Sequence, residues 1–127
     1  MLVVDTDVVI DVLRRHPPAI DWLLLLNEQP IALPGFVAME LVQGCANKTE
    51  QARMEQIIAR YVVAWPSAVD CNHALNTFAQ LRLSHGISLL DTLIAHTAIE
   101  LDAPLATFNQ KHYLAIPKLQ LVQPYAH

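Results

Sequence analysis

The sequence has little cysteine and little glycine, and each shortage excludes a class of site. Its 127 residues include two cysteines, Cys45 and Cys71, which are far apart and fit no metal-binding spacing. They are typical of small buried residues in a reducing compartment. Three glycines are too few for a glycine-rich loop that binds phosphate.

Long apolar runs and excess positive charge are also missing. No segment approaches the ~18 uncharged apolar residues of a membrane span, and no basic leader precedes the apolar start, which Asp5 interrupts. We therefore expect a cytoplasmic protein with no membrane partner. The net charge is -4, whereas broad nucleic-acid-binding surfaces are usually basic. Any role with nucleic acid must rest on local positive charge, a bound cation or assembly.

Short β-branched apolar segments alternate along the chain with helical patterns. Apolar residues make up 54% of the sequence, which predicts one globular domain over residues 1–127. Strands are expected at 2–4, 31–33, 61–65, 105–107 and 119–122. Helices are expected at 8–14, from 18 through the apolar run 22–26, at 34–44, within 48–60, at 67–84 (amphipathic) and at 88–101. This alternation predicts an α/β fold with helices on the faces of a parallel sheet.

The first apolar segment runs directly into carboxylates at Asp5, Asp7 and Asp11. Parallel α/β sheets bind ligands at the carboxyl ends of their strands, and Asp5 stands at that end of the first strand. It is equally suited to cap the helix that follows. Asp7 falls in the first turn of that helix, where negative charge suits the helix dipole. Asp11, four residues later, is expected to be solvated.

Glu40 lies inside the apolar helical segment "GFVAMELVQG", with Phe36 and Val37 on the same face one turn back. A carboxylate is costly to bury there unless something pairs with it. Pointing outward into solvent is the alternative. However, the segment has few other polar residues that define a solvated face.

Asp91, in "ISLLDTLIAHTA", has a structural and a functional interpretation. Ser88 and Asp91 match a helix capping box. Small residues at Ala95 and Ala98 follow on the same face and would let the helix lie close to a neighbour. Clustered carboxylates repel one another, and a divalent ion with oxygen ligands relieves that repulsion. The three separated acids Asp5, Glu40 and Asp91 therefore suggest a site for a hard cation.

Four motifs in order resemble the PIN domain, in particular the VapC-type ribonuclease toxins of bacterial toxin–antitoxin pairs. They are "VVDTDVVID", "AMELVQG", "LLDTLIAHTA" and "LATFNQKHY", and together they cover nearly the whole chain. The resemblance implies an α/β/α sandwich with a central, mostly parallel sheet of about five short strands. It also implies a metal-dependent endoribonuclease that forms a homodimer and binds an antitoxin protein.

The resemblance also assigns the site residues. The family's Mg²⁺ or Mn²⁺ ligands match Asp5, Glu40 and Asp91. The family's fourth position, often acidic, matches the neutral Asn109, which favours one firmly held ion and leaves a second open. Thr6 and Thr107 match hydroxyl residues that hydrogen-bond a carboxylate or a metal-bound water; ordinary capping and strand propensity explain them equally well.

Substrate and partner contacts are less clearly marked. Arg14 and Arg15 are expected to contact RNA phosphates at the end of the first helix, and Lys111 beside Asn109; solvated helix ends are the alternative for each group. The resemblance implies in-line attack by a metal-bound water with the 3′ oxygen leaving. The apolar run 22–26 and the faces of the helix at 34–44 are candidate contact surfaces for the dimer or the antitoxin, unless they belong to the core.

Two rival functions stay open from the sequence alone. "DTDVV" also matches the D-x-D-x-[T/V] opening of haloacid-dehalogenase-type phosphatases, with Asp5 as nucleophile and Asp7 as acid. That class needs a downstream lysine, for which Lys111 and Lys118 are poor fits. The second rival is a catalytically inactive PIN scaffold that binds only a protein partner.

Overall fold

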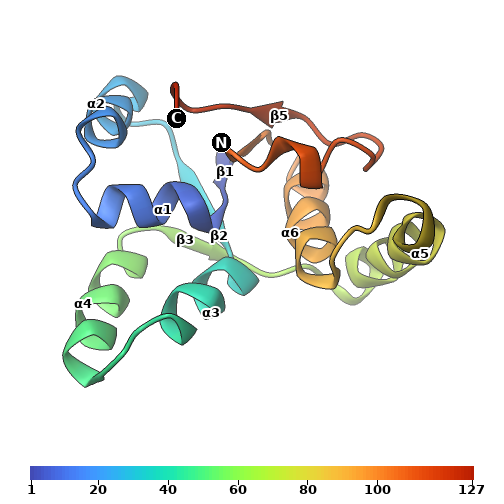
Figure 1. Ribbon diagram of the computed structural model, residues 1–127, viewed down its shortest axis with the longest axis horizontal. Coiled ribbons are helices and arrows are strands. Elements are labelled where there is room, and N and C mark those ends of the chain that lie inside the picture. Colours follow the sequence, from blue (N-terminus) through green and yellow to red (C-terminus); the bar gives the residue numbers. More distant parts are fainter.

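The computed structural model describes residues 1–127 as a sheet of five strands with six α-helices and one short 3₁₀ helix around it (Figure 1). In chain order the elements are β1 (Leu2–Val4), α1 (Thr6–Leu13), α2 (Pro17–Leu26), β2 (Ile31–Pro34), α3 (Gly35–Gln43), α4 (Lys48–Ile58), β3 (Val62–Ala64), α5 (Ala68–His85), α6 (Leu89–Glu100), β4 (Leu105–Ala106), η1 (Gln110–His112) and β5 (Leu121–Val122). Each strand and helix expected from the sequence is present, with boundaries that differ by a few residues.

The strands lie in the order β3-β2-β1-β4-β5, and every neighbouring pair is parallel. The predicted α/β sandwich with a parallel sheet of five strands is therefore confirmed. Val3 lies opposite Ala32 on one side and Leu105 on the other, so β1 is the middle strand. Its position explains its composition, because a strand covered on both faces must be apolar throughout.

The order of the strands determines where the helices lie. The chain moves outward from β1 to β3 and then returns past β1 to β4, so its right-handed crossovers fall on opposite faces of the sheet. Figure 1 shows α1 to α4 grouped on one side of the strands and α5 and α6 on the other. The direction reverses between β1 and β4, and parallel sheets bind ligands outside the carboxyl ends of two such strands.

Small residues let α6 lie close to the rest of the core. Ala95 and Ala98, which the sequence places on one helix face, are completely buried, as are Ile94 and the strand residue Leu33. The helix contacts both α3 and β2. This close approach brings the first turn of α6, with Asp91, toward the edge of the sheet where β1 ends.

Helix α5 differs from the amphipathic helix expected at 67–84. It packs mainly on α6, with the Thr77 hydroxyl 2.8 Å from Nε2 of the buried His96. Its apolar residues do not form one buried face, since Leu75 is 62% exposed and Leu83 is 85% exposed. The helix ends at Gly86, whose φ of 61° is left-handed and suits glycine. None of the helices combines the length and apolar character that crossing a bilayer requires.

The close contact of α6 gives a stability prediction. Replacing Ala98 by Leu adds three carbons where no space exists and should lower the free energy of unfolding by about 1–3 kcal/mol. The matched control is Ala79→Leu, the same change at an exposed position of α5. Urea unfolding followed by circular dichroism measures both. Equal stability of the two variants would contradict the close packing of α6.

Candidate metal centre

Asp5 serves both roles that the sequence left open. It is the N-cap of α1, because its Oδ1 accepts a hydrogen bond of 2.8 Å from the backbone N–H of Thr6. Its Oδ2 accepts two more, each 2.9 Å long, from the hydroxyls of Thr107 and Tyr113. The residue is only 5% exposed. Three donors from separate parts of the chain therefore fix the orientation of this carboxyl group.

Burial dominates the electrostatics of Asp5. Loss of hydration raises the pKa of its carboxyl group above the ordinary value, and the hydrogen bonds from Thr6, Tyr113 and Thr107 oppose that shift only in part. The nearby charge of Asp91 raises the pKa further. Folding therefore places a carboxylate where its negative charge is unfavourable in the absence of a counter-ion.

Asp91 forms only half of the capping box that the sequence suggests. The Ser88 hydroxyl oxygen accepts a hydrogen bond of 3.0 Å from the Asp91 backbone N–H, but the Asp91 carboxylate accepts none from the Ser88 backbone N–H. Instead, Asp91 Oδ1 lies 3.2 Å from the Tyr113 hydroxyl, and Oδ2 lies 3.5 Å from Nδ1 of His112. The carboxylate thus turns away from its own helix and toward the Asp5 side chain.

Glu40 completes the acid cluster from α3. Its Oε1 accepts a hydrogen bond of 3.3 Å from the hydroxyl of Thr6, the residue that follows Asp5. Partial burial raises the pKa of Glu40, and the charges of Asp5 and Asp91 raise it further. The structure therefore brings the three acids predicted from the sequence to one edge of the sheet, where the charge of Asp91 raises the pKa of both Asp5 and Glu40.

Asp7 also belongs to this region, although the PIN resemblance gave it no role and the sequence suggested a favourable contact with the helix dipole. Its Oδ2 accepts a hydrogen bond of 3.0 Å from the backbone N–H of Phe108. It also lies 3.4 Å from the Thr107 hydroxyl, whose one proton points mainly to the nearer Asp5 Oδ2. Its Oδ1 is buried and has no hydrogen-bond partner. Burial, and then the charge of Asp5, raise the pKa of Asp7. The D-x-D spacing after a buried strand is the signal that identifies it.

The expectation that Asp11 is solvated is wrong. Its Oδ2 accepts a hydrogen bond of 2.8 Å from the Tyr125 hydroxyl and lies 3.1 Å from Nε2 of His127. Tyr125 in turn packs edge-on against Trp22 and Phe108. Asp11 therefore joins α1 to the segment after β5, and its role in the structure is to hold these elements together.

Two residues that flank the strand ends have different surroundings. Thr107 is completely buried, and its hydroxyl oxygen also accepts a hydrogen bond of 3.1 Å from the Asn109 backbone N–H. The Asn109 side chain is exposed and makes no hydrogen bond within the chain. An exposed amide at this place leaves the acid cluster with carboxylates from Asp5, Asp7, Glu40 and Asp91 alone.

Tyr113 was not singled out from the sequence. Its hydroxyl is the group that touches both Asp5 and Asp91. Burial and the two neighbouring acids raise the pKa of this hydroxyl above its ordinary value of 10, so it remains a hydrogen-bond donor. Nothing local in "NQKHYLA" distinguishes a tyrosine whose hydroxyl reaches a functional site from one that only fills the core.

The only basic side chain within 4.0 Å of the clustered acids is His112. All ion-pair contacts within 4.0 Å involve a histidine, so no lysine or arginine is paired with a carboxylate. Carboxylate oxygens are the ligands that hard divalent cations such as Mg²⁺ prefer. An unpaired buried oxygen of Asp7 beside an unneutralised cluster therefore fits a divalent cation.

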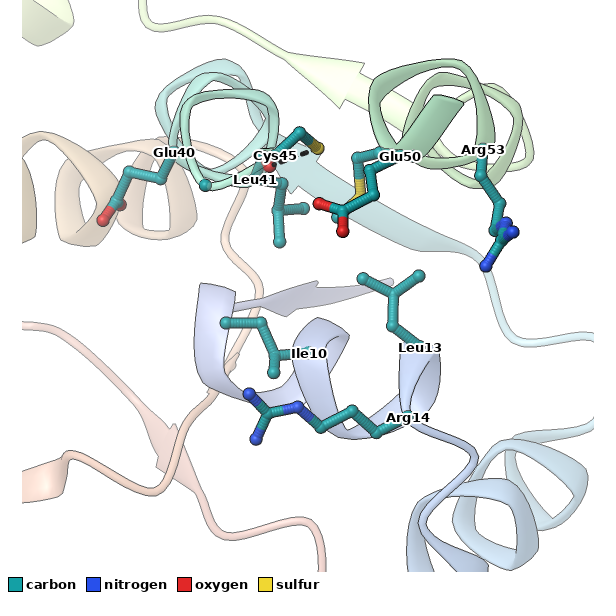
Figure 2. A pocket seen from close by; sticks show the side chains of 10 residues that line it. Ile10, Leu13, Arg14, Glu40, Leu41, Cys45, Glu50 and Arg53 are labelled. Carbon is teal, nitrogen blue, oxygen red and sulfur yellow. Dashed lines mark hydrogen bonds between the residues drawn. The ribbon is translucent and has the colours of Figure 1, made fainter. Parts of the chain in front are cut away.

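A cavity of about 440 Å³ extends from Glu40 between α1, α3 and α4 (Figure 2). Arg14, the C-cap residue of α1, and Arg53 from α4 border it, and neither forms an ion pair with a carboxylate. Arg53 was missed by sequence reasoning, because α4 carries no motif of its own. The other predicted RNA contacts, Arg15 and Lys111, are exposed and do not line this cavity.

Comparison with known proteins identifies the fold. The protein-family model for the PIN domain matches residues 2–116. The chain belongs to the PIN-domain family. Ribonucleases VapC19 and VapC10 of Mycobacterium tuberculosis (strain H37Rv) are each 34% identical to this PIN domain. The alignments cover 94% of this chain, with 98% of VapC19 and 91% of VapC10.

Solved structures of toxin–antitoxin proteins share the fold of this PIN domain. Rickettsia felis VapBC2 bound to a DNA fragment from its promoter gives a TM-score of 0.81 at 27% identity, over 95% of this chain and 96% of that chain. VapBC-1 from nontypeable Haemophilus influenzae gives 0.78 at 26% identity, over 97% of each chain. The haloacid-dehalogenase alternative is therefore wrong, and no lysine lies beside Asp5 as that class requires.

The buried, partly unpaired Asp7 gives a prediction about stability. Asp7→Asn removes the negative charge but keeps an oxygen that accepts the hydrogen bond from Phe108. Because the pKa of Asp7 is raised in the folded state, its charged form opposes folding at neutral pH. Without metal, the variant should unfold about 3 °C higher than the parent at pH 7.

This gain should disappear as the pH falls below the ordinary pKa of 3.8, where Asp7 is protonated in both the folded and unfolded states. Differential scanning calorimetry at pH 7 and below that pKa measures the two differences. Asp21→Asn, the same change on the exposed side of α2, is the control. A lower unfolding temperature of Asp7→Asn at pH 7 would contradict the unfavourable charge.

Proposed function

We propose that the chain is a metal-dependent endoribonuclease, the toxin component of a toxin–antitoxin pair, and that it hydrolyses phosphodiester bonds of RNA. The observation that carries the proposal is the convergence of Asp5, Glu40 and Asp91 at one sheet edge without a neutralising lysine or arginine. Repelling carboxylates reduce stability and are retained where function uses them. Relatives named ribonucleases support the reaction class.

Asp5, Glu40 and Asp91 would hold Mg²⁺ or Mn²⁺ through carboxylate oxygens, with Asp7 close by. When bound, the ion lowers the pKa of a coordinated water and stabilises the charge that develops on the phosphate during in-line attack. The neutral, exposed Asn109 supplies no carboxylate, which supports one firmly held ion. We include Asn109 as a catalytic candidate, since its exposed amide is free to bond with substrate.

Other side chains of the chain would prepare the site. Thr6 and Thr107 hold Glu40 and Asp5 by hydrogen bonds and so keep their oxygens in place before substrate arrives. Arg14 and Arg53, on the walls of the cavity next to Glu40, would bind RNA phosphates. Arg15 and Lys111 would add contacts outside the cavity. This local positive charge would compensate for the acidic chain as a whole.

We further propose that the protein binds a cognate antitoxin and forms a homodimer. The related VapBC structures, above 25% identity, are of toxin–antitoxin proteins. In the apolar run 22–26, Trp22 is buried while Leu24 and Leu25 are exposed, so this run divides between the core and the surface. On α3, Met39 borders an apolar cavity of about 550 Å³ together with Trp65. These exposed apolar groups are suited to protein contacts.

Asp5→Asn tests the catalytic site directly. It keeps the size of the side chain and the acceptor for Thr6 but removes the charge that a cation needs. With Mg²⁺ or Mn²⁺ and total cellular RNA, cleavage should fall roughly 100-fold or more, the scale of losing one electrostatic stabiliser. Sequencing of the RNA 5′ ends measures cleavage and identifies the sites. Asp21→Asn, with the same loss of charge on α2, should cleave like the parent.

Undiminished cleavage by purified Asp5→Asn would exclude the proposed site. Absence of cleavage by the parent on total RNA at either metal would favour the second candidate, an inactive scaffold that binds only a protein partner. The two candidates also differ in metal binding, because a scaffold has no use for the cation.

Thermal unfolding with added Mn²⁺ distinguishes these two candidates. A cation that binds only the folded state at 100 times its dissociation constant stabilises the protein by about 2.7 kcal/mol. The parent should therefore unfold several degrees higher in millimolar Mn²⁺, and Asp5→Asn should not. Chelation by EDTA should reverse the shift. An unchanged unfolding temperature of the parent would favour the scaffold.

A further inference from the structure

Tyr113 occupies a central place among the acids. It follows η1, is 1% exposed, and its hydroxyl lies 2.9 Å from Asp5 Oδ2 and 3.2 Å from Asp91 Oδ1. These two acids come from opposite sides of the sheet, since Asp5 precedes α1 and Asp91 lies on α6. A single hydroxyl group thus spans the two elements whose relative position defines the site.

One hydroxyl has one proton, so it cannot give full hydrogen bonds to both acids at once. The shorter contact identifies Asp5 as the main acceptor, with the Asp91 oxygen facing the same group. An ionised carboxylate offers about four acceptor positions, and Asp5 uses three of them, for Thr6, Thr107 and Tyr113. One acceptor position remains free on Asp5.

We propose that Tyr113 is a positioning residue of the metal centre: its hydroxyl holds the carboxylates of Asp5 and Asp91 in the mutual orientation that a shared divalent cation requires. This inference rests on the proposed function. Hydrogen bonds from outside the ligand set orient metal ligands, and their loss typically weakens metal binding 10- to 100-fold. Without the hydroxyl, repulsion would turn the two carboxylates apart.

The alternative is that Tyr113 only fills the core, where its ring packs among buried apolar residues. The ring and the hydroxyl can be separated, because phenylalanine keeps the ring and removes only the oxygen. A core role predicts a change in folding stability alone. A positioning role predicts a change in cation affinity as well.

Tyr113→Phe tests this role by isothermal titration with Mn²⁺, in the absence of RNA. The matched control is Tyr125→Phe, which also removes a tyrosine–aspartate hydrogen bond, of 2.8 Å, but at Asp11. We expect Tyr113→Phe to bind Mn²⁺ at least about tenfold more weakly than the parent. Tyr125→Phe should bind it within about twofold of the parent, although both variants lose stability without metal.

If the parent binds Mn²⁺, two results of this titration would overturn the inference alone. Equal Mn²⁺ affinity of Tyr113→Phe and the parent would leave the hydroxyl a core role only. Tighter binding by the variant would mean that the hydroxyl competes with the cation for the carboxylate oxygens. A parent that binds no Mn²⁺ would overturn the proposed metal centre itself, and Tyr113 with it, so the two failures are distinguishable.

A second measurement applies even if Tyr113→Phe does not fold. The parent can be labelled with 3-fluorotyrosine and titrated with diamagnetic Mg²⁺ while its ¹⁹F spectrum is recorded. The resonance of Tyr113 should shift with the cation, whereas those of Tyr61 and Tyr125 should stay in place. A Tyr113 resonance unmoved by saturating Mg²⁺ would overturn the role.

Discussion

The parallel pairing of β1 with β4 is the interaction on which the site depends. It places the end of one strand beside the end of another that lies about a hundred residues later in the chain, so that the Thr107 hydroxyl meets Asp5 Oδ2 at 2.9 Å. The chain places β2 and β3 on one side of β1 and β4 and β5 on the other, so the order of the strands reverses at this pair. The carboxyl ends of β1 and β4 are therefore accessible to α3 and α6. Glu40 and Asp91 can reach Asp5 only because these helices meet there.

The same arrangement of buried acids lowers the stability of the folded chain at neutral pH. The carboxyl groups of Asp5, Asp7 and Glu40 all have raised pKa values, and burial is the main cause in each case. At neutral pH these carboxyl groups are ionised in the unfolded chain, and folding makes the ionised form less favourable for each of them. Hydrogen bonds from Thr6, Thr107 and Tyr113 reduce this cost without removing it. A divalent cation, as we propose for this site, would offset the remaining repulsion.

Local patterns in the sequence were sufficient to predict the strands and the helices and to mark three candidate acids, and the resemblance to the PIN domain assigned these acids to one metal site. Buried parallel strands are short and apolar, and Asp5, Glu40 and Asp91 interrupt apolar segments, so each stands out within its own neighbourhood. The small residues Ala95 and Ala98 likewise indicated the close approach of α6, which the structure has.

Contacts between distant segments could not be predicted in this way. The bonds of Asp7 to Phe108, of Asp11 to Tyr125 and of Tyr113 to Asp5 each join residues about a hundred positions apart. No periodicity encodes such pairs, since they follow from how the crossovers stack on the sheet. Arg53 was missed for the same reason. Most residues of α4 are exposed and carry no motif, and only the folded chain shows that Arg53 and Glu40 line the same cavity.

The unpaired state of the lysines and arginines has a consequence for ionic strength. Because none of them forms an ion pair within the chain, added salt has no such pair to weaken. Mobile ions screen the repulsion among the buried and partly buried acids only weakly, so moderate salt should change the stability of the fold little. The same ions would weaken the proposed contacts of Arg14 and Arg53 with RNA phosphates. Salt would therefore act mainly on these proposed contacts and much less on the folded chain.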